Sequence, residues 1–329
     1  MIRYLIIGCG LIGEKRATAL KYIKGAKLAG CFDINDSSAI NFSKKFNCER
    51  YTSIDQIKKS HKNFDATIIC TNHSSLPELS QVSINLEKHT FTEKPGARSY
   101  KELMQIKKLL SKKKVNFRLG YNHRYHPSIA KAVSIFKEGK IGDLMYIRGR
   151  YGHGGRLGYE KEWRFNKKIS GGGELIDQGP HLIDLALIFL GNISKVNASL
   201  KSYFWETELE DNAFLLLESN TGQTASLHLS CTEWKNKFSF EIFGKSGKLE
   251  VSGLGKSYGI EKLTHYKMGK KMGPPQTQSW EFPFEDNSWE LELKDFHKDI
   301  QGKVPSSIGI DQGLEILKVI DNCYKIGIT

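Results

Sequence analysis

A carboxylate and an imidazole stand four residues apart in the segment Ser170-Gly-Gly-Gly-Glu-Leu-Ile-Asp177-Gln-Gly-Pro-His181. Residues four apart share one face of a helix, so a helical path would place Asp177 beside His181. A carboxylate next to a histidine orients the ring and tunes its basicity, which is a common construction of a general base. A structural histidine with an aspartate that caps a helix would have the same spacing. The meaning of the pair therefore depends on its context.

A glycine triplet and an apolar helix surround this pair. Residues 171–173 are all glycine, which allows the backbone to come close to a neighbouring group. Residues 182–190 are mainly apolar and predict a buried helix. Pro180 has no backbone N–H, so we expect the helix either to begin near it or to kink there.

The first residues of the chain contain a glycine motif that predicts a dinucleotide site. The apolar run 2–7 predicts a buried parallel strand, and residues 14–22 predict a helix. Of the three glycines between them, the first permits a tight turn, the second lets the backbone approach a pyrophosphate, and the third allows close packing. The phosphates would lie at a helix N-terminus, where free N–H groups favour anions. We expect the cofactor to contact Gly8, Gly10, Leu11, Ile12 and Gly13.

Asp33 predicts which dinucleotide binds. It follows a second predicted strand, residues 27–32, and lies twenty residues after Gly13. A carboxylate there accepts hydrogen bonds from the adenosine ribose hydroxyls and repels a 2′-phosphate, so we expect NAD rather than NADP. Arg16, within the first helix, could counter a phosphate, but we expect it to lie at the surface or to face the pyrophosphate.

Two further strand ends carry polar side chains. Buried strands are predicted over residues 64–70 and from residue 89 onward. Ligands of such sheets bind beyond the carboxyl ends of the strands, so the residues that follow are expected to line the cofactor. These residues are Thr71, Asn72, His73, Glu93 and Lys94, with His73 expected to touch the nicotinamide ribose.

Lys94 has a possible chemical use at this edge. A lysine beside a nicotinamide can donate to the substrate oxygen and stabilise the alkoxide character that develops during hydride transfer. A lysine that extends to solvent or pairs with Glu93 would also fit the sequence. The Lys94–Pro95 bond is a candidate for the cis isomer. A helix over 99–113 and a strand over 115–119 then complete a nucleotide domain near Tyr121.

Composition narrows the class of protein. A length of 329 residues favours two domains, and neither a signal peptide nor a membrane span is expected. The six cysteines have no paired spacing, which favours reduced thiols in a cytoplasm and predicts no zinc site or other metal. The formal net charge of +13 comes largely from lysines on predicted helix surfaces. We expect it to attract an anionic small substrate, and we expect no nucleic-acid partner.

The second half begins with a polar, aromatic segment that could form a substrate wall. Residues 121–126 are expected to cross between the domains, and residues 152–165 combine glycines with histidine, arginine and aromatic side chains. A flexible surface loop is the alternative. The expected substrate contacts, besides Lys94, Asp177 and His181, are Tyr121, Arg124, His153, Arg156, Tyr159 and Arg164.

The remaining segments predict mainly strands. Residues 253–275 have no usable period and are interpreted as a long hairpin arm or loop. Asn287 is expected to cap a helix, and a last helix is expected over 311–325. Other helices are expected over 77–86 and 128–138, and strands over 143–151, 196–203, 212–218, 224–230, 238–243 and 248–251.

The order and spacing of these motifs resemble the Gfo/Idh/MocA family of oxidoreductases. The motifs are the glycine fingerprint with Asp33, the sequence Glu93-Lys94-Pro95, and the glycine triplet with Asp177 and His181. The resemblance implies an α/β protein: a Rossmann domain with a parallel sheet over 1–121, then an α/β domain with a large open, mostly antiparallel sheet over 122–329. It also implies that Lys94, Asp177 and His181 form the catalytic group. Homodimers or homotetramers that assemble through the open sheet face are implied as well.

The predicted reaction is hydride transfer between NAD and a sugar. His181 would remove the proton from a sugar hydroxyl, Asp177 would orient His181, and Lys94 would polarise the reacting oxygen. The arginines favour a nucleotide-linked or otherwise anionic sugar. A free polyol such as inositol, a glycosidase that oxidises its substrate transiently with bound NAD, and a non-catalytic NAD-binding regulator are the alternatives.

Overall fold

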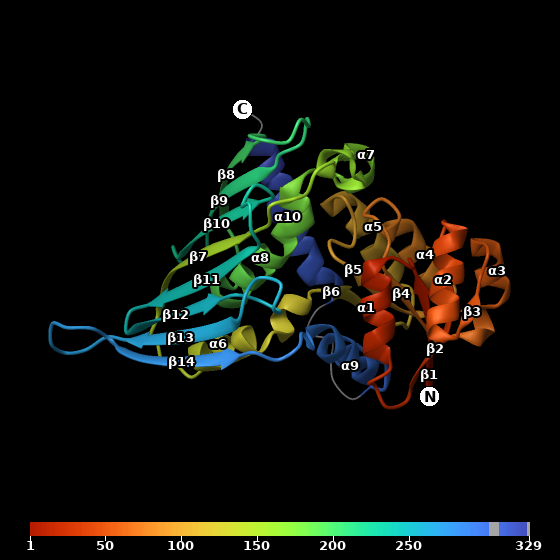
Figure 1. Cartoon of the computed structure of the whole chain (residues 1–329), viewed down its shortest axis with the longest axis horizontal. Helices are drawn as coiled ribbons and strands as arrows, with labels where there is room; N and C mark the ends of the chain where they lie inside the picture. The colour runs from red at the N-terminus through yellow and green to blue at the C-terminus, as the bar shows by residue number, and fades with distance from the viewer. Residues whose placement is uncertain (303–308, 328–329) are drawn as a thin grey trace. The chain divides into compact units, whose positions relative to one another are not determined.

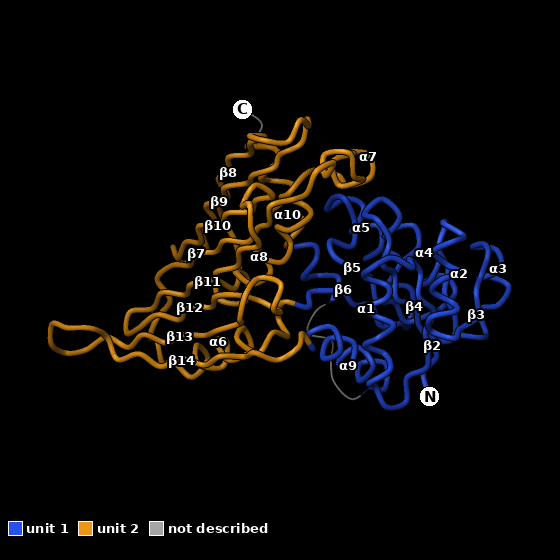
Figure 2. The backbone as a smooth tube through the Cα atoms, viewed as in Figure 1, with its two compact units in different colours: residues 1–122, 287–315 blue, residues 123–286, 316–329 orange. Residues whose placement is uncertain are grey.

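The chain forms two compact units, shown in different colours in Figure 2. The computed structural model describes residues 1–302 and 309–327. Unit 1 comprises Met1–Asn122 with Asn287–Glu315, and unit 2 comprises His123–Asp286 with Ile316–Thr329. The predicted domains were consecutive, 1–121 and 122–329, whereas in the structure a late segment belongs to the first unit. The substrate-binding role of the second domain stays a prediction.

Unit 1 is built on a six-stranded parallel sheet in the order β3-β2-β1-β4-β5-β6 (Figure 1). Parallel neighbours need crossover connections, and the helices between the strands provide them. The strand order reverses between β1 and β4, which is where ligands of doubly wound sheets bind. The strands are β1 (Ile2–Ile7), β2 (Ala26–Phe32), β3 (Glu49–Arg50), β4 (Ala66–Ile69), β5 (His89–Glu93) and β6 (Phe117–Gly120). The Rossmann prediction is thereby confirmed.

The helices of unit 1 include one from the far end of the sequence. Helix α9 (Ser288–Ile300) packs on α1, and its Leu293 and Phe296 are buried with Tyr4 and Phe91 in one core cluster. Asn287 lies at φ −97° and ψ 7°, away from the extended conformation of an N-cap, and its side chain accepts no N–H of the first turn within the described residues. Asn287 therefore occupies the predicted N-cap position of α9 without making the side-chain hydrogen bond of a cap. The other helices are α1 (Leu11–Leu20), α2 (Asp36–Phe46), α3 (Ile54–Lys59), α4 (Leu76–Asn85), α5 (Tyr100–Leu110) and the 3-10 turn η1 (His61–Asn63).

Unit 2 is built on an eight-stranded sheet in the order β14-β13-β12-β11-β7-β10-β9-β8. Adjacent strands of this sheet pair antiparallel, except for the parallel pair β7 and β10. The prediction of a large, mostly antiparallel sheet is thereby confirmed. The strands are β7 (Leu144–Gly152), β8 (Lys195–Lys201), β9 (Asn212–Glu218), β10 (Thr224–Ser230), β11 (Lys237–Gly244), β12 (Gly247–Ser252), β13 (Glu261–Lys267) and β14 (Gln276–Phe282).

Helices cover one face of this sheet and leave the other open. Along β7, Ile147 and Tyr151 are buried, whereas the alternate residues Arg148 and Arg150 are exposed. Helices α6 (Pro127–Lys137) and α8 (Glu174–Leu190) contact the sheet. Shorter turns are η2 (Asn122–Tyr125), η3 (Tyr159–Lys161), η4 (Trp163–Phe165) and α7 (Lys167–Ser170), and the last helix is α10 (Ile310–Ile326).

The structure makes two predictions for unit 2 more specific. Residues 253–275, expected as a long hairpin arm or loop, contain strand β13, which pairs antiparallel with β14, so the hairpin is confirmed and part of the segment is regular strand. Strand β14 at the sheet edge is mostly exposed, so the hydrophobic alternation that reveals a half-buried strand is absent from its sequence. Helix α8 begins at Glu174, six residues before Pro180. Pro180 therefore lies inside the helix, which excludes the first of the two expected alternatives, a helix that begins near Pro180.

Candidate active site

The glycine loop after β1 is shaped to receive a pyrophosphate. Gly8 has φ +100°, and a Cβ there would lie 2.5 Å from the carbonyl oxygen of Cys70. A Cβ on Gly13 would lie 2.0 Å from the carbonyl oxygen of Gly8. On Gly10 a Cβ would meet no described atom within 4 Å. Two glycines thus serve the packing of the loop, while Gly10 leaves open surface beside the N-terminus of α1, as a bound dinucleotide requires.

Asp33 is fixed against the same loop. Its Oδ2 accepts the backbone N–H of Cys9 at 2.7 Å, and its Oδ1 accepts that of Asn35 at 2.8 Å. A carboxylate can accept about four hydrogen bonds, so capacity remains for ribose hydroxyls. Leu11, 70% exposed, and the half-buried Ile12 flank this surface at the start of α1. Gly10, Leu11 and Ile12 therefore leave accessible surface at the start of α1, and their contacts with NAD stay predictions.

The segment after β4 is a tight polar turn. The Asn72 side-chain oxygen accepts hydrogen bonds from the hydroxyls of Ser74 at 2.9 Å and Ser75 at 3.1 Å. His73 is buried, at 3% exposure, while Thr71 is half-buried. The Asn72 side chain thus shapes the turn, and the cofactor contacts of Thr71, Asn72 and His73 stay predictions.

Glu93 and Arg16 lie in the core of unit 1, contrary to expectation. Arg16 is fully buried, and its Nε donates to Glu93 Oε1 at 2.7 Å. The expected surface position of Arg16 is wrong, because its guanidinium is neutralised inside the unit. The Glu93 carboxylate forms the other half of this ion pair with Arg16. Lys94 is half-buried at the end of β5, and the Lys94–Pro95 bond is cis as predicted.

The glycine triplet before α8 approaches protein atoms. A Cβ on Gly172 would lie 1.9 Å from the Tyr324 hydroxyl, and one on Gly173 would lie 2.2 Å from the Glu210 carbonyl oxygen. The Glu210 carboxylate accepts the N–H groups of Gly173 at 3.0 Å and Leu175 at 3.1 Å, and the Tyr324 hydroxyl at 2.7 Å. Glu210 thereby caps α8 with negative charge at its positive end, which fixes the start of the helix that carries the candidate base.

Asp177 and His181 are buried one helical turn apart on α8, at 4% and 6% exposure. Asp177 Oδ2 accepts a hydrogen bond from Arg164 Nε at 3.0 Å. The His181 ring stacks on His123, with centroids 3.8 Å apart and planes inclined by 28°. His123 was not among the predicted site residues. The signal that could have found it is the polar run 121–126, which was expected only to cross between domains.

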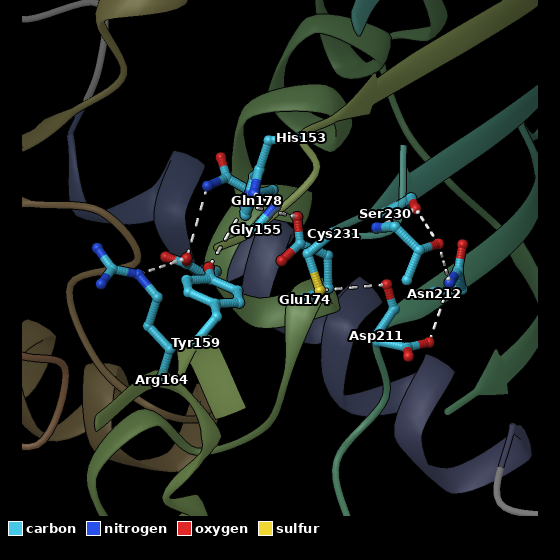
Figure 3. A network of polar contacts seen from close by, with 12 residues as sticks. His153, Gly155, Tyr159, Arg164, Glu174, Gln178, Asp211, Asn212, Ser230 and Cys231 are labelled. Atoms are coloured by element: carbon cyan, nitrogen blue, oxygen red, sulfur yellow. Dashed lines mark hydrogen bonds and ion pairs between the residues drawn. The ribbon is translucent and has the colours of Figure 1, made fainter. Parts of the chain in front are cut away.

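The loop after β7 supplies another histidine, His153, which lies beside Tyr159 and Glu174 (Figure 3). His153 Nδ1 accepts the N–H of Gly155 at 3.0 Å, so its Nε2 carries the proton in the neutral ring. Nε2 lies 3.4 Å from the Tyr159 hydroxyl and 3.7 Å from Glu174 Oε1. Burial lowers the pKa of His153 and raises the pKa of Tyr159. Near neutral pH both are therefore uncharged hydrogen-bonding groups.

The three predicted arginines differ in their availability. Arg124 donates to the fully buried Asp184 through two nitrogens, with Nε 2.7 Å from Asp184 Oδ2. Its guanidinium is therefore occupied by a structural ion pair. The Arg164 side chain is 34% exposed and pairs with Glu162 at 3.0 Å as well as with Asp177. Arg156 is 71% exposed and pairs with Glu162. Arg156 and Arg164 therefore remain candidates for an anionic substrate, whereas Arg124 serves the structure.

Tyr121 is fully buried, at 0% exposure, and its substrate contact stays a prediction. Within residues 1–302 and 309–327, no group of three or more His, Cys, Asp or Glu side chains is placed to hold a metal ion. In the same residues, every helix is too short or too polar to cross a membrane.

Comparison with known proteins identifies the family. One family model, described as an oxidoreductase family with an NAD-binding Rossmann fold, matches residues 2–121. A second, the GFO/IDH/MocA C-terminal domain, matches residues 129–250. The chain belongs to the Gfo/Idh/MocA oxidoreductase family. Its first unit is the NAD-binding Rossmann domain, which agrees with the open glycine loop and with Asp33, and NAD is its cofactor.

Members of this family with known substrates resemble the chain. Glucose-6-phosphate 3-dehydrogenase of Bacillus subtilis is 30% identical over 184 residues, which are 55% of this chain and 51% of that enzyme. The chain thus spans about half the length of this relative. A levoglucosan dehydrogenase structure, a complex with NADH and L-sorbose, superposes with a TM-score of 0.89 at 20% identity, covering 99% of this chain and 97% of that one. A UDP-N-acetylglucosamine 3-dehydrogenase from Acidithiobacillus ferrooxidans gives 0.82 at 20% identity, with 99% and 97% covered.

Proposed function

We propose that this protein is an NAD-dependent dehydrogenase that transfers a hydride between the nicotinamide and a hydroxyl-bearing carbon of an anionic sugar. The observation that carries the proposal is the buried pair Asp177 and His181 on one face of α8, beside Arg164. Buried titratable groups concentrated around one helix turn are typical of acid–base sites. Family membership supplies the cofactor, and the sugar chemistry is inferred from relatives.

The side chains have separate tasks in the proposed oxidation. The His181 ring takes the proton from the substrate hydroxyl as the C–H bond breaks, which leaves a keto sugar and an imidazolium. Asp177, one turn away on α8, stabilises that positive charge. The Lys94 ammonium stabilises the alkoxide character on the reacting oxygen. NAD, when bound, accepts the hydride.

His123 and His153 set the surroundings of the base. The stacked His123 ring restricts the orientation of His181, and it packs edge-on against Tyr151 with centroids 5.1 Å apart. Neutral His153 and Tyr159 offer hydrogen bonds to sugar hydroxyls without adding charge. Positioned neutral donors of this kind favour a polyhydroxylated substrate.

The anionic substrate class is supported by the partly exposed Arg164 and the exposed Arg156. One relative is named for glucose 6-phosphate and one structural neighbour for UDP-N-acetylglucosamine. A neutral sugar is the second candidate, because the predicted arginines all pair with carboxylates of this chain, which reduces the net charge that a phosphate would meet. Binding of an anionic sugar should depend on Arg156, whereas binding of a neutral sugar should not.

Replacing Arg156 with alanine should raise KM for a charged sugar by roughly 3- to 10-fold and should leave kcat unchanged. This factor corresponds to the loss of one exposed charge pair, which contributes up to about 1 kcal/mol or slightly more. The effect should shrink at high salt. Initial rates of NADH formation with a sugar phosphate, a nucleotide sugar and a free polyol measure it. Arg3, which pairs with Asp65 at 2.8 Å at the start of β1 in unit 1, offers the control substitution Arg3→Ala.

The same panel separates the alternatives. Equal efficiency with an uncharged polyol, unaffected by Arg156→Ala, would overturn the anionic class. Glycoside hydrolysis without net NADH would indicate a glycosidase that oxidises its substrate transiently. NAD binding with no turnover on any substrate would indicate a regulator.

We also propose that the chain forms a homodimer or homotetramer through the open face of the unit 2 sheet. Apolar side chains are exposed there, with Phe214 at 40% and Leu216 at 49%, and large apolar exposure favours an interface. Leu216→Asp should dissociate the assembly, because an interface would bury an unpaired carboxylate. Sedimentation velocity measures the change, and Leu157→Asp, at a fully exposed loop residue, is the control. A monomeric wild type would refute the proposal.

A further inference from the structure

Three charged side chains from distant parts of the sequence meet in the core of unit 1. Arg16 of α1, Glu93 of β5 and Glu292 of α9 are 0%, 8% and 0% exposed. Arg16 Nε donates to Glu93 Oε1 at 2.7 Å, and Arg16 Nη2 lies 2.5 Å from the same oxygen. Arg16 Nη2 also lies 2.7 Å from Glu292 Oε2. One guanidinium thus joins two helices to the end of a strand.

Aromatic rings close around this guanidinium. Its central carbon lies 4.4 Å from the Phe91 ring centroid and 4.6 Å from that of Trp289. Burial opposes the charge of Arg16, but Glu93 and Glu292 hold its pKa above the ordinary value. Burial also raises the pKa of Glu292 to about 7. The cluster therefore keeps a charged arginine in an apolar enclosure.

Such a cluster is weak as a stabilising device. The desolvation of buried charges offsets much of their attraction, and apolar residues of similar volume often stabilise a core as well or better. Its geometry gives it another use. Glu93 immediately precedes Lys94, and Arg16 belongs to the helix that begins at the open glycine loop.

Gly120 on β6 shows how closely the Arg16–Glu93 contact is enclosed. A Cβ at this position would lie 3.0 Å from both Arg16 Nη2 and Glu93 Oε2, so these atoms would have to move by a few tenths of an ångström. The carboxylate before Lys94 is consequently held by the guanidinium, which Glu292 of α9 also binds, and it is enclosed by the backbone of the next strand.

We propose that Arg16 is a positioning residue for Lys94, acting through Glu93. Arg16 fixes the Glu93 carboxylate and hence the backbone from which the Lys94 side chain extends. This inference rests on the proposed function, in which Lys94 stabilises the reacting oxygen. It assigns a role in the reaction to a buried arginine that touches neither substrate nor cofactor.

Arg16→Lys is the informative variant, because a lysine keeps the charge but lacks the planar fork that joins two carboxylates. It should lower kcat by about 10- to 100-fold, since a misplacement of about 1 Å can cost two orders of magnitude, while KM and the NAD dissociation constant stay near wild type. Arg3→Lys is the control. Arg3 also belongs to unit 1 and binds a carboxylate through two nitrogens, with Nε 3.1 Å from Asp65 Oδ2 and Nη2 2.8 Å from Asp65 Oδ1, at the start of β1. Steady-state kinetics, NAD titration and thermal unfolding are measured for both.

Equal kcat losses in the two variants would overturn the proposal, as would a loss confined to NAD binding. If Arg16→Lys does not fold, Gly120→Ala carries the test, because its methyl group displaces the Arg16–Glu93 contact without removing charge. An unchanged kcat in Gly120→Ala would then refute the role. Lys94→Ala is included in the series: full activity there would refute the proposed function itself, whereas an inactive Lys94→Ala beside a fully active Arg16→Lys would refute only this inference.

Discussion

Replacing His181 with alanine is expected to lower kcat by about 100- to 10,000-fold, the usual contribution of a general base. NAD affinity should be almost unchanged, because the dinucleotide surface belongs to the glycine loop and Asp33 in unit 1. Lys94→Ala should lose turnover on the same scale through loss of alkoxide stabilisation. Asp177→Asn should cost less, because the imidazole that accepts the proton remains. Single-turnover hydride transfer, followed by NADH absorbance, separates these effects from product release.

The control for this series is His265→Gln. His265 is also a buried histidine of unit 2, at 8% exposure, but it lies on β13, away from α8. The rate of His265→Gln, calculated per folded molecule, should equal that of the wild type. A nearly wild-type rate in His181→Ala would mean that another group accepts the proton. His153 would be the next candidate and Tyr159 the one after it.

Local motifs made much of the fold predictable. The glycine fingerprint places a strand before it and a helix after it, because its turn has few alternative geometries. Strands β9 and β10 occur at the predicted residues, since an apolar run in β9 and alternating apolar residues in β10 flank the turn Asn220-Thr-Gly222. The open antiparallel sheet came from the family resemblance, because strand periodicity does not specify the order of strands in a sheet.

Long-range contacts were not predictable in the same way. The partners of the glycine triplet, Glu210 and Tyr324, are distant in sequence, so the triplet indicated a close approach without naming what approaches. Arg16 looked like a surface residue because its second carboxylate comes from α9, whose return to unit 1 has no local signal. The ion pair of Arg124 with Asp184 was also not predictable, because these two residues are distant in sequence.

Replacing Asp33 with alanine is expected to weaken NAD binding by about 10- to 150-fold, the equivalent of 1.5–3 kcal/mol for hydrogen bonds to a charged group. The wild type should bind NAD more tightly than NADP, because the carboxylate repels a 2′-phosphate. The variant should narrow this difference, since the repulsion disappears together with the ribose hydrogen bonds. Titration of both cofactors against both proteins, by quenching of intrinsic fluorescence, measures the two changes.

Asp33 also accepts the N–H groups of Cys9 and Asn35, so part of its effect could arise from a loosened loop. The two contributions differ in selectivity. A loosened glycine loop weakens NAD and NADP equally, because both carry the same pyrophosphate, whereas loss of the carboxylate charge favours NADP relative to NAD. Asp36→Ala is the matched control, since Asp36 is a mostly exposed carboxylate three residues away that pairs with Arg50, and it should leave both affinities unchanged. Equal affinity of the wild type for the two cofactors would contradict the selective role of Asp33. If Asp33→Ala lost affinity for NAD and for NADP by the same factor, the role of Asp33 would be restricted to holding the loop.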